Sequence, residues 1–169
     1  MDATYQRFQV RAWQPDDRQA AFTLIRDVLA EYGLGCEPQG ADQDVWEVEQ
    51  FYHQTGGEFW VVEQAGAIVG TAAFYPVAAI AGGQRAVEIR KMYLHPTVRG
   101  QGLGRWLLAQ LEVRIQTQGY DQIRIETASV LKTAVQLYER SGYQPDPHVE
   151  TTRCDRAYVK SLSPLSLDG

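Results

Sequence analysis

Residues 98–108 read Val-Arg-Gly-Gln-Gly-Leu-Gly-Arg-Trp-Leu-Leu, and the rest of the chain is best understood from this stretch. A strand-like run from Val87 to Leu94 leads into it, and His95-Pro96 marks a turn between the two. After the glycines, apolar residues recur at helical spacing. A glycine-rich loop before a helix start brings backbone N–H groups close to a ligand. The stretch therefore predicts a binding site for an anion such as a phosphate.

The spacing of the three glycines distinguishes this loop from two other phosphate sites. Gly100, Gly102 and Gly104 alternate with single residues, whereas the dinucleotide fingerprint requires the spacing G-x-G-x-x-G. A P-loop requires lysine and then serine or threonine after its last glycine, and here Arg105-Trp106 follows instead. The structural alternative is a tight strand-to-helix turn, but such a turn does not need alternate glycines.

The composition is that of a globular protein. The chain has 169 residues, of which 44% are hydrophobic and 11% aromatic, and this predicts a single domain over residues 1–169. A formal net charge of -5 argues against nucleic acid as a partner. We expect a cytoplasmic protein without membrane contact, because no signal peptide is visible and the least polar run, residues 71–82, is too short to span a bilayer. Cys36 and Cys154 are expected to be free thiols.

Apolar patterning predicts an α/β protein with a mixed sheet and helices on both faces. The predicted strands cover residues 8–13, 59–62, 67–72 (with a possible extension to 77), 86–94, 121–127, 143–145 and 154–162. The predicted helices carry their apolar stripes over residues 21–32, 43–53, 103–115 and 131–140. A turn is expected at 81–84 and a frayed tail at 163–169. A helix joins strands 86–94 and 121–127, so these two are expected to be parallel neighbours.

Two blocks of sequence carry a resemblance to a known family. The first runs from Glu88 to Pro96 and continues through Arg99-Gly100-Gln101-Gly102-Leu103-Gly104 to Leu107-Leu108. The second is the stretch from Ala134 to Tyr143, which includes Leu137-Tyr138 and Gly142-Tyr143. Over nearly its whole length the sequence resembles the GNAT superfamily of acetyl-CoA-dependent N-acetyltransferases. The resemblance implies the GNAT fold, with a partly splayed mixed sheet of six to seven strands and about four helices on both faces.

The resemblance also implies acetyl-CoA as a co-substrate and no metal. Backbone N–H groups from Gly100 to Arg105 would receive the pyrophosphate at the positive end of the helix dipole, with Arg99 and Arg105 as cationic partners. The strand before the loop would bulge and pair with the pantetheine arm. The expected cofactor-binding residues are Met92, Tyr93, Leu94, Arg99, Gly100, Gln101, Gly102, Leu103, Gly104 and Arg105. Strand alternation places the side chains of Met92 and Leu94 on the face of Glu88 and Arg90, with Lys91 and Tyr93 opposite.

Two residues are candidates for acid and base chemistry. Glu88 would accept a proton from the attacking amine through a water, although a sheet ion pair with Arg90 or a lysine is the alternative. Tyr138 lies where the family places the acid that protonates the departing thiolate, although a core tyrosine with a buried hydroxyl would also fit this spacing. Many relatives carry asparagine about two turns before that tyrosine, and Leu131 stands there in this chain.

The acceptor of the acetyl group is less determined by the sequence. The segments expected to surround it contain Tyr32 and Arg153 together with acidic and other polar residues: Glu31, Asp42, Asp44, Trp46, Glu47, Glu49, His148 and Glu150. Acidity would attract a cationic amine, but a solvated helix face explains it more simply, and Arg153 would suit a carboxylate. We expect transfer to the primary amine of a small molecule or amino acid. Peptide acetylation, non-catalytic acyl-CoA binding, nucleotide binding and a homodimer stay open.

Overall fold

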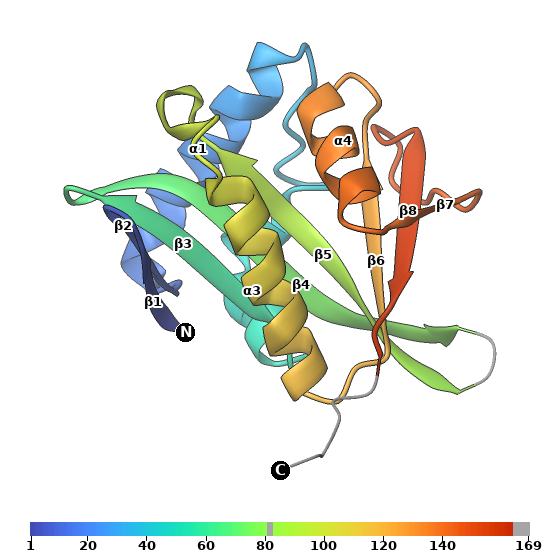
Figure 1. The fold of residues 1–169 in the computed structure, drawn as a ribbon. Coiled ribbons are helices and arrows are strands. Elements are labelled where there is room, and N and C mark those ends of the chain that lie inside the picture. The colour runs from blue at the N-terminus through green and yellow to red at the C-terminus, as the bar shows by residue number, and fades with distance from the viewer. Residues whose placement is uncertain (81–82, 164–169) are drawn as a thin grey trace.

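The computed structural model describes residues 1–80 and 83–163, which form a mixed sheet with helices on both faces (Figure 1). The strands are β1 (Asp2–Tyr5), β2 (Phe8–Ala12), β3 (Glu58–Gln64), β4 (Ala67–Ile80), β5 (Gln84–Leu94), β6 (Gln122–Thr127), β7 (Gln144–Asp146) and β8 (Arg156–Ser161). The α-helices are α1 (Arg18–Glu31), α2 (Gln43–Trp46), α3 (Leu103–Thr117) and α4 (Lys132–Arg140). Single turns of other helix types are η1 (Pro15–Asp17), η2 (Glu49–His53) and η3 (Pro96–Val98).

The sheet order is β1-β2-β3-β4-β5-β6-β8-β7. The strands β5 and β6 are parallel, with Ala86 opposite Gln122 and Ile89 opposite Ile125, which confirms the predicted crossover through α3. The expected six to seven strands are eight in the structure, because β1 was not predicted from the sequence. The tight turn at Gln6, where φ is 53°, folds this short polar segment back onto β2.

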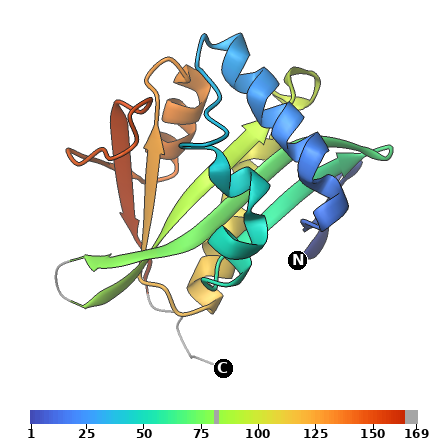
Figure 2. The same cartoon turned by 180° about the vertical axis from the view of Figure 1, so that it is seen from behind.

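Two apolar layers sandwich the sheet. On one face, α3 packs through Leu107 and Leu111 against Val62 of β3 and Ile89 of β5. On the other face, α1 and the 45–52 segment pack against the opposite side of β3 and β4 (Figure 2). The helix predicted over residues 43–53 is divided into α2 and η2. None of the helices in the described part of the chain combines the length and apolar character needed to cross a membrane.

The C-terminal half of β5 departs from regular strand geometry. Lys91 has a φ of 52°, and the register with β4 shifts between Thr71 and Ala73, so the expected bulge is present. The predicted side-chain faces are therefore wrong beyond this point, because a bulge inserts one residue and reverses the alternation. Met92 and Leu94 pack in the α3 layer, whereas Tyr93 packs in the α1 layer.

The strands β5 and β6 also separate toward their C-terminal ends. Their pairing ends at Ile89 and Ile125, although β5 continues to Leu94, and Figure 1 shows the two ribbons diverging. The edge of β5 that faces β6 is thus left without a neighbouring strand after Ile89 in the described structure. Two other expectations lie partly or wholly outside the described residues: the turn at 81–84 and the tail at 163–169.

Candidate active site

A cavity of about 340 Å³ opens where β5 and β6 diverge. It brings together segments that are far apart in the sequence: α1, the β5 bulge, the glycine loop, the end of β6, α4 and the loop before β8. Among the predicted site residues, those that line the cavity are Glu88, Met92, Tyr93, Leu94, Arg99, Gly100, Gly102, Gly104, Arg105 and Tyr138. Gln101 and Leu103 do not line it. The two predicted groups, the anion loop and the acid–base pair, therefore share one cavity.

The glycine loop presents its backbone at one end of the cavity, which we call the loop end (residues 99–105). Gly100 and Gly102 have φ values of 73° and 80°, a conformation that suits glycine. In the described structure, the N–H groups of residues 100–105 have no acceptor, and the first bond of α3 runs from the N–H of Trp106 to the carbonyl of Gly102. A row of unpaired N–H groups at the start of a long helix is a ready site for an anion.

Two side chains of this stretch have structural roles instead of lining the cavity. Leu103 is 1% exposed and belongs to the core. Gln101 accepts a hydrogen bond from Arg7 through its side chain, at 3.0 Å, and its carbonyl accepts one from the Tyr5 hydroxyl at 3.2 Å. What Gln101 and Leu103 offer to a ligand in the cavity is their backbone N–H groups, which have no acceptor in the described structure.

The two arginines of the loop end differ in their contacts. Arg99 donates to both carboxylate oxygens of Glu31, at 2.6 and 3.0 Å, and to the carbonyl of Leu94 at 2.9 Å. Its guanidinium therefore ties α1 to the loop. Arg105 is exposed and forms no ion pair within residues 1–80 and 83–163. Of the two, Arg105 has the donors available for a phosphate.

Glu88 lies on β5 below the point where the strands separate. Its side chain is buried, with 7% of the residue exposed, and this burial raises its pKa to about 7. The carboxylate lies 3.5 Å from Nε of Arg90, which is a loose ion pair. The structure is thus compatible with both roles predicted for Glu88, a partner of Arg90 and a base that changes protonation near neutral pH. A base is most effective when its pKa lies near the working pH.

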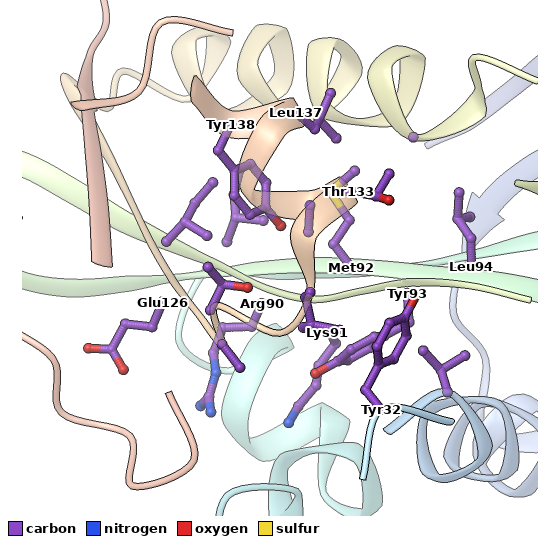
Figure 3. A pocket seen from close by; sticks show the side chains of 18 of the residues that line it. Tyr32, Arg90, Lys91, Met92, Tyr93, Leu94, Glu126, Thr133, Leu137 and Tyr138 are labelled. Atoms are coloured by element: carbon purple, nitrogen blue, oxygen red, sulfur yellow. The ribbon is translucent and has the colours of Figure 1, made fainter. Parts of the chain in front are cut away.

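Tyr138 reaches the cavity from α4, and Figure 3 shows its ring pointing from the helix toward β5. The ring packs edge-on against Tyr143 at 5.9 Å between centroids. Burial raises the pKa of Tyr138 above its ordinary value, so the phenol keeps its proton at neutral pH. Among the described residues, its hydroxyl has no hydrogen-bond partner, whereas the Tyr52 and Tyr158 hydroxyls each donate to a carboxylate. A buried hydroxyl facing a cavity without a partner is available to a ligand.

At the β5 bulge, away from the loop end, buried charged side chains around Asp42 hold three segments around the cavity together. Lys91, which is 4% exposed, donates to Asp42 at 2.6 Å and to the carbonyl of Ala41 at 2.8 Å. Arg153 donates to both oxygens of Asp42, at 2.5 and 2.7 Å. The ion pairs hold the pKa of Asp42 well below its usual range. Three segments, the β5 bulge, the loop before α2 and the loop before β8, are thus fixed to one carboxylate.

We call this region, formed by Glu88, Arg90, Lys91, Arg153 and Cys154, the acceptor end. Of the residues that the sequence suggested for it, Tyr32 and Arg153 line the cavity. Asp42 and Asp44 are buried at 0% and 2% exposure and neutralise cations, so they do not form a solvated acidic face. Sequence reasoning missed Cys154 and gave no binding role to Arg90, although strand alternation had already placed Arg90 on the same face as Glu88.

A cysteine nucleophile and a metal ion are two other means of catalysis that the residues around the cavity bear on. Burial raises the pKa of Cys154 to about 11, so this thiol stays protonated at neutral pH and is a poor nucleophile. Within the described residues, no group of three or more histidine, cysteine, aspartate or glutamate side chains is arranged to hold a metal ion. The polar groups that the cavity does offer include backbone N–H groups, arginines, the Glu88 carboxyl group of raised pKa and the phenol of Tyr138.

Comparison with known proteins places these features in a family. The acetyltransferase (GNAT) family model matches residues 22–143. The uncharacterized N-acetyltransferase YjgM of Escherichia coli is 35% identical over 131 residues, which are 76% of this chain and 77% of that protein. The chain spans less than half the length of several mammalian N-acetyltransferases that it also matches.

Solved structures share the fold at low sequence identity. A GNAT-family acetyltransferase from Staphylococcus aureus has a TM-score of 0.82 at 18% identity, covering 92% of this chain and 99% of that one. A phosphinothricin acetyltransferase from Sinorhizobium meliloti, solved in complex with acetyl-CoA, has a TM-score of 0.73 at 17% identity, covering 96% and 95%. These likenesses concern the fold, and the roles of individual residues rest on the geometry described above.

Proposed function

The chain belongs to the acetyltransferase (GNAT) family and is an N-acetyltransferase, and from this premise we propose the finer function. Residues 1–169 act as one domain that moves the acetyl group of acetyl-CoA directly to the primary amine of a small molecule or amino acid. The observation that carries this proposal is the shared cavity, which joins an unpaired row of backbone N–H groups to Glu88 and Tyr138.

The residues at the loop end fit acetyl-CoA. Its pyrophosphate needs several donors and positive charge, and the N–H groups of residues 100–105 and the Arg105 side chain offer both. Its pantetheine arm contains amide groups that can add to an open strand edge, and β5 has such an edge from Arg90 to Leu94. We assign the backbones of Met92, Tyr93 and Leu94 to this contact. When bound, acetyl-CoA supplies a thioester carbonyl that an amine can attack.

Glu88 is proposed as the general base. A primary amine is mostly protonated at neutral pH and must lose a proton before its nitrogen can form the new C–N bond. The Glu88 carboxyl, with its pKa raised to about 7 by burial, can accept that proton directly or through one water. Its loose contact with Arg90 at 3.5 Å leaves carboxylate lone pairs available to the incoming amine.

Tyr138 is proposed as the general acid. As the C–S bond breaks, the sulfur carries negative charge, and the phenol can donate its proton there. The raised pKa of Tyr138 ensures that the proton is present at neutral pH. Cys154 stays a protonated thiol because burial raises its pKa to about 11, which supports direct transfer over transfer through an acetylated cysteine.

A thiol-release assay with acetyl-CoA tests this function. The purified protein is offered amino acids, alkylamines, polyamines, aminoglycosides and short peptides, and free CoA is measured at pH 8. We expect CoA release that depends on at least one small amine. Release with peptides alone would contradict the small-molecule acceptor. Tight CoA binding without release from any amine would contradict catalysis and favour an acyl-CoA-binding module.

A further inference from the structure

Five cationic side chains line the cavity, and they differ in how completely their donors are used. The five are Arg90, Lys91, Arg99, Arg105 and Arg153. Lys91 has three oxygen atoms within 3.2 Å, and Arg153 and Arg99 each hold both oxygens of one carboxylate. Arg105 lies at the loop end, where the pyrophosphate is expected. Arg90 is therefore the cation of the acceptor end whose donors are least used by the protein itself.

Arg90 has five N–H donors but only long contacts in the described structure. Its contacts with carbonyl and carboxylate oxygens are to Ala41 at 3.4 Å, Glu88 at 3.5 Å and Asp44 at 3.7 Å. These distances exceed those of ordinary charged hydrogen bonds, which are about 2.7–2.9 Å. The guanidinium also lies over the ring of Tyr75, 5.6 Å from its centroid. Among the described residues, the group is thus held in place without a short hydrogen bond to a carboxylate.

Its position next to Glu88 suggests what would satisfy it. The two side chains form a pair of opposite charges 3.5 Å apart, with 19% of the Arg90 side chain exposed in the wall of the cavity. An α-amino acid carries the complementary pair, an ammonium group and a carboxylate on the same carbon. Figure 3 shows Arg90 pointing away from the face of β5 that carries Met92, so the two charges of the acceptor would meet the strand on the side opposite the Met92 side chain.

We propose that the acceptor carries a carboxylate beside its amine, as an α-amino acid does, and that Arg90 binds this carboxylate while Glu88 faces the amine. This inference rests on the proposed function. Arg153 does not compete for the carboxylate, because Asp42 occupies its guanidinium.

The proton transfer strengthens this arrangement. When Glu88 takes the proton of the amine it becomes neutral, and Arg90 then loses the nearer of its two carboxylate partners. Only Asp44, at 3.7 Å, would remain. A carboxylate on the acceptor replaces the lost charge, whereas an acceptor without one leaves a partly buried guanidinium poorly paired, which is costly. The preference for an anionic acceptor is therefore expected during the reaction and not only on binding.

Matched pairs of acceptors test the proposal. The twenty standard amino acids and the amines that correspond to loss of their α-carboxylate are compared by kcat/KM in the thiol-release assay. We expect the wild type to prefer the best amino acid over its matched amine by about 100-fold. Arg90→Gln should lower kcat/KM for that amino acid about 100-fold and change the matched amine less than about threefold. Arg90→Lys, which keeps the charge but not the two-pronged geometry, should lie between them.

Arg26→Gln serves as the charge control, because Arg26 is exposed on α1 and, in the part of the chain that the structure describes, pairs with its neighbour Asp27. It should behave as the wild type does. If the wild type acetylates the matched amines as well as the amino acids, or acetylates amines but no amino acid, the role of Arg90 is wrong while the proposed function stands. If Arg90→Gln keeps the wild-type preference, the role of Arg90 is likewise wrong. If no amine of any class releases CoA, the proposed function fails as well.

Discussion

The two ends of the cavity are built in different ways. The loop end is made by one continuous stretch, residues 99–105, and offers mainly backbone N–H groups. The acceptor end is made by side chains of β5 and of the loop before β8, and Asp42 of a third segment holds the two together. A backbone site tolerates changes in most side chains but depends on glycine, whereas a side-chain site can be altered one residue at a time. This difference explains how one fold can keep its cofactor while its acceptors vary.

The comparison predicts distinct kinetic effects. Changes at the loop end should raise the KM for acetyl-CoA, and changes at the acceptor end should affect the amine. Residues that move protons should lower kcat whichever substrate is varied.

The largest effect is expected for Tyr138, which we propose as the general acid and not as a binding residue of either end. Tyr138→Phe removes only the hydroxyl and should lower kcat by about 100- to 1,000-fold, with both KM values within about threefold. Steady-state thiol release at pH 8 measures this. Tyr143→Phe is the matched control, since the Tyr143 hydroxyl is also buried without a hydrogen-bond partner among the described residues but the residue does not line the cavity. Undiminished turnover by Tyr138→Phe would remove the general acid from the mechanism.

The next largest effect is expected for Glu88 and depends on pH. The carboxyl must be unprotonated to accept a proton, and burial raises its pKa to about 7. Wild-type kcat/KM for the amine should therefore decrease as the pH is lowered through about 7, because Glu88 then becomes protonated. Glu88→Gln should lower kcat/KM about 100-fold at pH 8 and abolish this acid limb.

The control for Glu88 is Glu63→Gln, because Glu63 pairs with Arg11 outside the cavity. This variant should keep both the rate and the limb near pH 7. The base assignment is contradicted if Glu88→Gln retains the limb, since the titrating group would then be a different one.

A smaller effect, confined to the loop end, is expected for Gly102. A Cβ at this position would lie 2.7 Å from the Tyr5 hydroxyl, in a backbone with φ of 80°. Gly102→Ala should raise the KM for acetyl-CoA about tenfold, because the loop must shift and its N–H groups lose their alignment. The KM for the amine should not change. Steady-state kinetics with each substrate varied in turn separates the two KM values.

Gly66→Ala is the matched control for this variant. Gly66 also has φ of 80°, but a Cβ there would meet nothing within 4 Å. It lies in the β3–β4 turn, away from the cavity. Equal KM values for acetyl-CoA in the two variants would show that the loop backbone does not bind the cofactor.

The smallest effect is expected for Glu31, whose carboxylate holds Arg99. Glu31→Gln should raise the KM for acetyl-CoA only about threefold, because Arg99 positions the loop from a partly exposed ion pair. Asp27→Asn, on the same helix and paired with Arg26, should have no effect. A lower KM in Glu31→Gln would mean that Glu31 competes with the cofactor for Arg99, contrary to the positioning role.

The same contrast explains how much the sequence alone could predict. The loop and its helix, the parallel crossover to β6 and the position of Tyr138 all follow from local patterns, because each depends on residues close together in the chain. The faces of Met92 and Leu94 were assigned wrongly, since alternation cannot reveal a bulge that forms where Lys91 reaches Asp42, 49 residues away in sequence. The long contacts of Arg90 were also hidden, because Asp44 lies on a distant segment and already binds Tyr52 and Lys91.

We have proposed that the acetyl group passes directly from acetyl-CoA to an amine held beside Glu88. Mass spectrometry with deuterated acetyl-CoA distinguishes direct from indirect transfer, by following the label in both the amine and the protein, with and without the amine. We predict label on the amine nitrogen only, and unlabelled protein in every sample. Labelled protein in the absence of amine, with the label on Cys154, would contradict direct transfer.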